Sequence, residues 1–370
     1  MPAVFLPEPW AHPRFLALFD MPPGSGAAAI LPDHAIFAHR SKLPVCAAQI
    51  GAQARGSVLD LSSARIEQLA ALHAVIGATP AEIIVQPAGQ AAQTAHVYRA
   101  SADMPELQPA VDLTSEQAEL LCLACAEIMS LADTHPVATL RARWPMALGH
   151  AASVLRARAE PELNTLRGHW SRADITLDRP SQPYAWYFGV REDDLRFRRF
   201  DGQMSVSVKR AGFVMSDAVT VLPYDPVRDR VMLIEQVRFG PWLRGVANAW
   251  SLEPIAGRVD PFESPVAAAL REAQEEARLE LSADQLHAVG NVYPSPAAIT
   301  EFLYHYVALC DLPDGSDGIA GLATESEDIR SHLISYKQLM ALVASGEVQN
   351  GPLVLTAWWL TAHRDALRAG

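Results

Sequence analysis

The sequence predicts a fold of class α+β with two domains, the first rich in short β-strands and the second a mixture of strands and helices. Three observations predict this fold. The chain has 370 residues, of which 50% are hydrophobic and 19% charged, a composition typical of a globular protein with about two domains. Short candidate strands separated by turn residues fill residues 1–105, whereas residues 114–158 carry apolar side chains at helical spacing. From residue 184 onward, candidate strands and helices are mixed.

Composition and charge exclude several classes of protein. The formal net charge is −12, so a broad nucleic-acid-binding face is not expected, because a polyanion would be repelled. No apolar stretch approaches the roughly 18 residues that span a bilayer, and the first residues lack the basic segment of a signal peptide. Four cysteines do not make a disulfide framework. We expect a cytoplasmic protein with no nucleic-acid partner and no membrane partner.

The first half is expected to hold a small β-rich domain, 1–105, and a helical connector, 106–165, that packs on it. Candidate strands cover residues 35–38, 56–61, 83–86 and 95–98. Thr114 begins a helix rich in alanine and leucine, and a second helix is predicted over 136–158. The polar, proline-bounded segment 161–183 suits a linker.

The second half is expected to form one mixed domain over 172–370. Candidate strands cover 219–222 and 231–236, and the residues between them, 225–229, have the composition of a turn. The final segment, 353–368, is predicted to be a helix.

A helix with three acidic residues on one face is the most informative part of the sequence. Ser264 is a good N-cap and Pro265 a good first helical residue, so the helix is expected to begin there. Glu272, Glu275 and Glu276 follow at i, i+3 and i+4, which places three carboxylates on one face. A divalent cation relieves their repulsion, and an all-oxygen site favours Mg²⁺, with Mn²⁺ as a substitute, over Zn²⁺.

The spacing around this helix resembles the Nudix box. This resemblance implies the Nudix fold for the second domain, a mixed β-sheet sandwiched between helices in an α-β-α arrangement. Six residues match the fixed positions of that motif: Gly257, Glu263, Arg271, Glu272, Glu275 and Glu276. By composition, a chance match anywhere in the chain is on the order of 10⁻⁵. Arg271 can pair with Glu275 at i+4 and hold it in place. Arg278 stands where the motif has the glycine that ends the helix, so the departure concerns the helix end and removes no metal ligand.

A second acidic cluster lies at 321–330 and contains Glu325 and Glu327. Alone it has the composition of a solvated loop. Beside a Nudix box it resembles the catalytic loop of ADP-ribose pyrophosphatases, which implies that Glu325 deprotonates the attacking water. The resemblance implies four metal-binding groups: the carbonyl of Ala256, Glu272, Glu276 and Glu327. Glu275 would be a further ligand or an orienting residue in the catalytic set.

The same resemblance implies substrate-binding residues. Arg210 and Arg238 match positions that contact substrate phosphates and adenine. Tyr187 and Phe188 match an aromatic pair that stacks on adenine from the other subunit, and Glu301 ends a proline-containing segment that accompanies ADP-ribose specificity. As alternatives, the arginines could form surface ion pairs and the aromatic pair could be core. Similar enzymes are homodimers, so a homodimer is expected.

Segments of the first half resemble the γ-glutamylcyclotransferase-like (AIG2-like) fold, among them 31–37 and 95–98. Such a domain fused to a Nudix domain of the ADP-ribose type is the arrangement of TrgB-like proteins, named for tellurite resistance. Residues 6–9 replace the substrate-binding turn of active cyclotransferases, and the expected glutamate near 72–76 is absent. We therefore expect a degenerate domain that serves packing, dimerisation or partner binding.

Two further patterns have structural explanations. Cys122 and Cys125 form a C-x-x-C within an apolar helical run, which indicates buried helix residues rather than a metal or redox site. Trp358 and Trp359 in the final helix are expected in the core.

The sequence therefore predicts a Mg²⁺-dependent Nudix hydrolase that cleaves the pyrophosphate bond of ADP-ribose to AMP and ribose 5-phosphate. The nearest alternative is the same chemistry on another nucleoside diphosphate sugar or a dinucleotide. A nucleotide-sensing binding protein is a second alternative, which the intact acidic set argues against. A third, an active cyclotransferase, lacks its glutamate.

Overall fold

The computed structural model describes residues 2–39, 42–100, 107–109, 112–321 and 328–369. They form two compact units, Met1–Val214 and Met215–Gly370. The domain boundaries inferred from the sequence stay predictions. Within the described segments, every helix is too short or too polar to cross a membrane.

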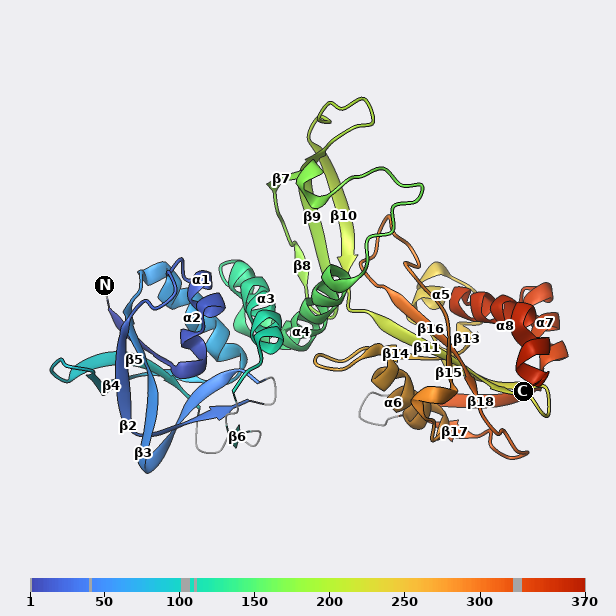
Figure 1. The fold of residues 1–370 in the computed structure, drawn as a ribbon, viewed down its shortest axis with the longest axis horizontal. Coiled ribbons are helices and arrows are strands. Elements are labelled where there is room, and N and C mark those ends of the chain that lie inside the picture. Colours follow the sequence, from blue (N-terminus) through green and yellow to red (C-terminus); the bar gives the residue numbers. More distant parts are fainter. Residues whose placement is uncertain (1, 40–41, 101–106, 110–111, 322–327, 370) are drawn as a thin grey trace. The chain divides into compact units, whose positions relative to one another are not determined.

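The first unit contains a small closed β-barrel (Figure 1). Its strands are β1 (Ala3–Pro7), β2 (Ala27–Ala38), β3 (Pro44–Asp60), β4 (Thr79–Pro87) and β5 (Gln93–Arg99), and the short β6 (Gln108–Pro109) pairs with β2. Pairing runs from β1 through β3, β2, β4 and β5 and returns to β1. All four predicted strands are confirmed as parts of longer ones. Pro32 lies at a bulge in β2, and Gly51 lies inside β3. Proline and glycine are typical of turns, so the strands predicted from the sequence were shorter than the observed ones.

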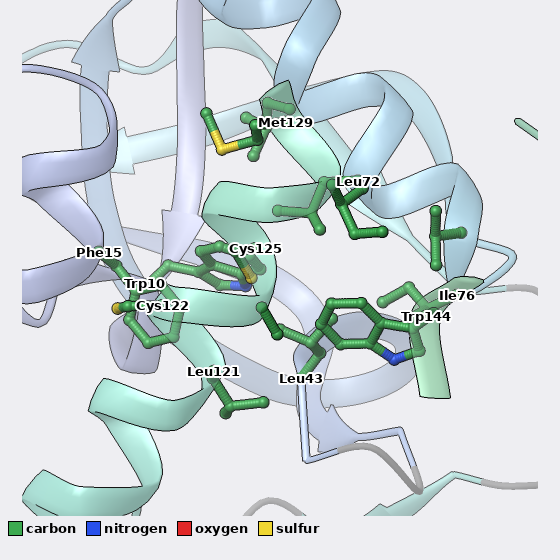
Figure 2. Packing of buried hydrophobic residues seen from close by; sticks show 14 of the residues in the cluster. Trp10, Phe15, Leu43, Leu72, Ile76, Leu121, Cys122, Cys125, Met129 and Trp144 are labelled. Carbon is green, nitrogen blue, oxygen red and sulfur yellow. The ribbon is translucent and has the colours of Figure 1, made fainter. Parts of the chain in front are cut away.

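Helices pack against this barrel and form a hydrophobic core together with some of its strand residues. They are the short η1 (Glu8–Ala11), α1 (Pro13–Leu18), α2 (Ser63–Val75), α3 (Ser115–Leu131) and α4 (Val137–Ala159). Figure 2 shows their cluster, in which Trp10, Leu72 and Trp144 are buried. The two predicted connector helices are confirmed, and Thr114 begins α3 with a capping box. Helix α2 was not predicted, because it lies within a region whose turn residues and short apolar runs indicated strands.

The two cysteines of the C-x-x-C are buried on α3, as predicted, and neither is in a disulfide (Figure 2). Burial raises the pKa of the Cys122 thiol to about 12 and that of Cys125 well above its ordinary value. A thiol that stays protonated is a poor nucleophile and a poor metal ligand. Both residues therefore serve packing.

A separate four-stranded sheet follows α4 and the short η2 (Arg172–Asp174). Its strands are β7 (Ile175–Arg179), β8 (Tyr184–Ala185), β9 (Gly189–Phe197) and β10 (Val208–Val214), and β9 pairs with the other three. The prediction of a linker over 161–183 is therefore wrong for β7. All five residues of β7 are exposed, so the strand lacks the apolar alternation of a half-buried one.

The second unit is built on a mixed eight-stranded sheet (Figure 1). Its strands are β11 (Ala218–Asp225), β12 (Arg230–Val237), β13 (Trp250–Glu253), β14 (Ile255–Arg258), β15 (Leu286–Val292), β16 (Leu303–Leu309), β17 (Ile319–Ala320) and β18 (Ile329–Ser335). Strands β11 and β16 are parallel, and the other pairs are antiparallel. The predicted strands 219–222 and 231–236 are confirmed.

Helices lie on both faces of this sheet, as the α-β-α prediction requires. They are α5 (Phe239–Arg244), α6 (Pro265–Ala277), the short η3 (Ala283–Gln285), α7 (Tyr336–Ser345) and α8 (Gly351–Ala369). Met232 and Ile234 of β12 pack with α6, whereas Val231 and Leu233 pack with α7 and α8. The final helix is confirmed, but Trp358 is 57% exposed, so its assignment to the core is wrong. It lies on the solvent side of an amphipathic helix.

His73 of α2 is a buried titratable group in the first unit. Its ring stacks on Tyr98 with centroids 4.3 Å apart, and Nδ1 donates to the Leu69 carbonyl over 2.9 Å. Burial lowers the pKa of His73 to about 4, although the bond to Leu69 acts in the opposite direction. Unfolded histidine titrates near pH 6.5, so between these values the unfolded state binds more protons.

We expect the first unit to lose stability as the pH falls. The contribution of His73 is fully present above pH 6.5 and is lost as the pH falls towards 4, because the folded ring resists protonation. The free energy of unfolding should fall by about 2 kcal/mol between pH 7.5 and pH 5. Urea titrations at each pH measure it. His73→Phe keeps a ring and should flatten the dependence; an unchanged slope in this variant contradicts the assignment.

Candidate active site

Helix α6 begins and ends as separate local signals dictate. Ser264 Oγ accepts the N–H of Ala267 over 3.1 Å, and Pro265 occupies the first turn, so the predicted start is confirmed. The helix ends at Arg278, which adopts the left-handed conformation with φ 55° and ψ 30°. Its N–H donates to the Gln274 carbonyl over 3.0 Å. The chain thus forms a left-handed C-cap without the glycine that usually provides it.

The Arg271 guanidinium lies among three carboxylates. Its Nη1 donates to Glu272 over 2.7 Å and to Glu275 over 2.8 Å. Nη2 donates to Glu263 over 3.1 Å and to the Arg258 carbonyl over 2.9 Å. Partial burial alone would lower the pKa of Arg271, but the hydrogen bond to Glu263 and the charge of Glu272 raise it above its ordinary value. The predicted Arg271–Glu275 pair is confirmed within a larger network.

Two carboxylates of α6 converge on the backbone of β14. Glu276 is 2% exposed, and its Oε2 accepts the N–H of Ala256 over 2.8 Å. A Cβ added at Gly257 would lie 1.8 Å from Glu272 Oε1, so the Glu272 carboxylate occupies the space that any side chain at 257 would need. Glycine at this position is what lets the carboxylate approach the strand. Carboxylate and carbonyl oxygens are the donors that Mg²⁺ prefers, so this set fits such an ion.

The described residues do not by themselves complete a metal site. Among them, no group of three or more histidine, cysteine, aspartate or glutamate side chains is arranged to hold a metal ion. Glu325, the expected base, and Glu327, the expected fourth metal-binding group, lie outside the described residues.

Arg238 lies next to the same sheet, at the end of β12. Its Nε and Nη2 donate to both oxygens of Glu253, the shortest contact being 2.6 Å. Glu253 is buried, so the pair is shielded from water on one side. Arg238 therefore forms an ion pair, which the sequence analysis gave as an alternative to a substrate contact. The sequence analysis did not identify Glu253 as its partner. Alternation along β13 pointed the wrong way, because a polar residue after apolar Leu252 predicts an exposed side chain, whereas Glu253 is buried.

Glu301 belongs to the same electrostatic neighbourhood. Burial raises the pKa of its carboxyl. The positive charges of Arg258 and Arg238 act to lower this pKa, whereas the negative charge of Asp217 acts to raise it. The structure places Glu301 within range of the Arg238 charge, and the role of Glu301 towards a substrate stays a prediction. It adds Arg258 and Asp217, which sequence reasoning missed. Arg258 directly follows Gly257, the glycine of the motif, and this adjacency could have indicated that Arg258 belongs to the site.

Arg238 and Glu253 line a pocket of ≈ 830 Å³ in the second unit. Trp250, Glu235 and His332 contribute to one side, and His332 Nε2 lies 2.8 Å from Glu235 Oε2. Residues of α7 and of the segment 346–351 also line this pocket. The volume is in the range of small-molecule sites.

Three of the expected substrate contacts belong to the first unit. Arg210 is exposed on β10, and its Nη1 donates to the Lys209 carbonyl over 2.9 Å. Tyr187 is 55% exposed, so it is not a core residue, and its ring meets that of Phe188 edge-on with centroids 4.8 Å apart. Their roles towards a substrate stay predictions.

Comparison with known proteins identifies the family. The model of the NUDIX domain matches residues 215–355. An ADP-ribose pyrophosphatase of Escherichia coli (strain K12) is 36% identical over 199 residues, which cover 54% of this chain and 93% of the relative. The chain belongs to the Nudix family. An ADP-ribose pyrophosphatase of Haemophilus influenzae is 33% identical over 202 residues, covering 54% of this chain and 92% of the relative.

A GDP-mannose pyrophosphatase of Escherichia coli (strain HS) is more distant, at 28% identity over 178 residues, 48% of this chain and 90% of the relative. With the matched domain and these relatives, the protein is a Nudix hydrolase of the ADP-ribose type. The acidic helix α6 lies within the residues that the domain model matches.

We expect Gly257→Ala to disable this Nudix hydrolase. The new Cβ would displace Glu272 from its position over β14, and a misplacement of about 1 Å can lower activity by about 10²-fold. The kcat for pyrophosphate-bond hydrolysis should fall by at least about ten-fold. Chromatography of the nucleotide product measures it. Gly318→Ala is the matched control, because its Cβ meets nothing within 4 Å. Equal activity in both variants contradicts the close approach.

Proposed function

We propose that this protein hydrolyses the pyrophosphate bond of ADP-ribose to AMP and ribose 5-phosphate with the help of Mg²⁺. The observation that carries the proposal is the convergence of Glu272 and Glu276 on Ala256 and Gly257. Relatives named ADP-ribose pyrophosphatase, at 33–36% identity, support the choice of substrate.

The metal would be held by the Ala256 carbonyl, Glu272, Glu276 and Glu327. A bound Mg²⁺, or Mn²⁺ in its place, would neutralise the diphosphate and acidify a water. Arg271 holds Glu272 and Glu275 in position before a cation binds, because it donates to both. The carboxylates on the acidic face of α6 are therefore held in position even without a bound cation.

The remaining residues divide the work of binding and proton transfer. Glu325 would take the proton of the attacking water, whose oxygen bonds to one phosphorus. The bond from that phosphorus to the bridging oxygen breaks, and this oxygen leaves with the other phosphate. Arg238 and Arg210 would hold the diphosphate, since a guanidinium offers a fork of donors to phosphate oxygens. Glu301 would orient the substrate beside Arg238.

Two other activities remain as alternatives with their own support. The GDP-mannose pyrophosphatase relative supports turnover of another nucleoside diphosphate sugar. A nucleotide-sensing protein would need the pocket beside Arg238 but not the acidic face of α6, whose ordered carboxylates favour an enzyme.

We also propose a homodimer in which Tyr187 and Phe188 stack on the adenine bound to the partner subunit. The apolar side chains that the β7–β10 sheet and its loops expose support a contact there: Trp170, Ile175, Leu177, Phe197, Phe200 and Phe213. The closed barrel supports a degenerate AIG2-like role for the first domain, which would make the protein TrgB-like and cytoplasmic.

We expect purified protein to release AMP from ADP-ribose only when Mg²⁺ or Mn²⁺ is present. Glu276→Gln and Glu325→Gln should each lower kcat by about 10²–10⁴-fold, because one removes a metal-binding carboxylate and the other the base. AMP is measured by chromatography, and circular dichroism checks the fold. Glu280→Gln is the matched control, since Glu280 is exposed just beyond α6.

Other outcomes point elsewhere. Turnover of GDP-mannose without turnover of ADP-ribose would replace the proposed substrate by the first alternative. Nucleotide binding without any turnover would favour the sensing protein.

We expect Arg238→Lys to raise KM for ADP-ribose by about ten-fold with kcat within about two-fold, because lysine keeps the charge and loses the forked contact. Steady-state kinetics measure both constants. Arg368→Lys is the control, since Arg368 pairs with Asp229 on the α8 side. An unchanged KM in Arg238→Lys removes this residue from the proposed site.

A further inference from the structure

Arg278 combines a strained backbone with a contact to a distant strand. Its φ of 55° lies in the left-handed region, which disfavours side chains with a Cβ. From there its Nη2 donates to the carbonyl of Ile319 over 3.0 Å. The residue at the end of the Nudix-box helix thus reaches β17, some 41 positions further along the chain. A glycine would form the same helix end without strain and without this bond.

Strand β17 forms one side of a hairpin whose other side is β18. The register pairs Ile319 with Arg330 and Ala320 with Ile329. Ile329 is fully buried and packs in the same cluster as Ala269 and Ala273 of α6. Both sides of the hairpin base are therefore tied to α6, one through apolar packing and the other through Arg278.

We infer that Arg278 is a positioning residue that fixes strand β17, and with it the paired end of β18, against the Nudix-box helix. The inference rests on the proposed function, in which Glu325, which stands between these two strands in the sequence, takes the proton of the attacking water. The proton acceptor must stand at a set distance from the carboxylates of α6, and small displacements lower the rate steeply. Among the described strands, β17 is two residues long and pairs with β18, and Gly318 just before it also donates to Ser331 Oγ over 2.8 Å. The bond from Arg278 adds a tie from β17 to α6.

Three variants separate the bond from the backbone. Arg278→Gly removes both the donor and the left-handed strain, Arg278→Met removes the donor and keeps the strain, and Arg278→Lys keeps a donor and the strain. If Arg278 positions the hairpin, kcat follows the donor: about ten-fold lower in the Gly and Met variants, and within about three-fold of wild type in the Lys variant. KM should change by less than about two-fold.

Stability should follow the backbone instead. Relief of the left-handed conformation is expected to raise the Tm of Arg278→Gly by roughly 2–4 °C, while the Met and Lys variants stay near wild type. A variant that is both more stable and slower distinguishes positioning from a general structural role, in which stability and rate would fall together. Wild-type kcat in the Gly and Met variants overturns the inference while leaving ADP-ribose hydrolysis standing.

Hydrogen exchange gives a readout that needs no substrate. Peptides that cover 317–321 and 328–332 should exchange faster in the Gly and Met variants than in wild type and in the Lys variant, because the hairpin base has lost one anchor. Equal exchange in all four proteins overturns the inference even if the wild type turns over no ADP-ribose. Absence of turnover in wild type with faster exchange in the variants instead rejects the proposed substrate and keeps Arg278 as the anchor.

Discussion

A single guanidinium surrounded by three carboxylates orders the acidic side of this hydrolase. Glu272 and Glu275 on α6 repel each other, and Glu263 in the preceding turn adds a third negative charge. Arg271 donates to all three and to the Arg258 carbonyl at the end of β14, so one side chain joins helix, turn and strand. A charge held this way is expensive to remove, because truncation of one partner leaves the others unpaired. The network therefore fixes the helix relative to the sheet.

The sheet determines where these carboxylates arrive. Strand β14 pairs with β11, with Gly257 opposite Val219 and Ala256 opposite Thr220. Apolar packing of Ala268, Ala269 and Ala273 brings α6 close to this face, because small side chains allow a short approach. A larger residue in this alanine stripe would hold the helix away, and one at 257 would displace the Glu272 carboxylate. The bond from Ala256 to Glu276 and the space above Gly257 both follow from that approach.

Much of this arrangement could be read from the sequence, where the signals are local. The start of α6 follows from Ser264 and Pro265, and its acidic face follows from the spacing of three glutamates. Contacts between distant segments gave no such signal. The pairing of Arg238 with Glu253 depends on the register of β12 with β13, and the bond from Arg278 to Ile319 depends on where β17 lies. Strand β7 was missed because its exposed residues lack the alternation that burial imposes.

Arg238 and Arg271 are each held by carboxylates before any substrate is present. Glu253 is buried, so Arg238 balances a charge that would be costly alone, and the guanidinium is oriented as a consequence. An oriented arginine loses less side-chain entropy when it meets a phosphate than a mobile one does. Arg271 does the same for the acidic face. The site therefore presents ordered positive and negative groups on one sheet, which suits chemistry whose rate depends on alignment and charge more than on covalent participation.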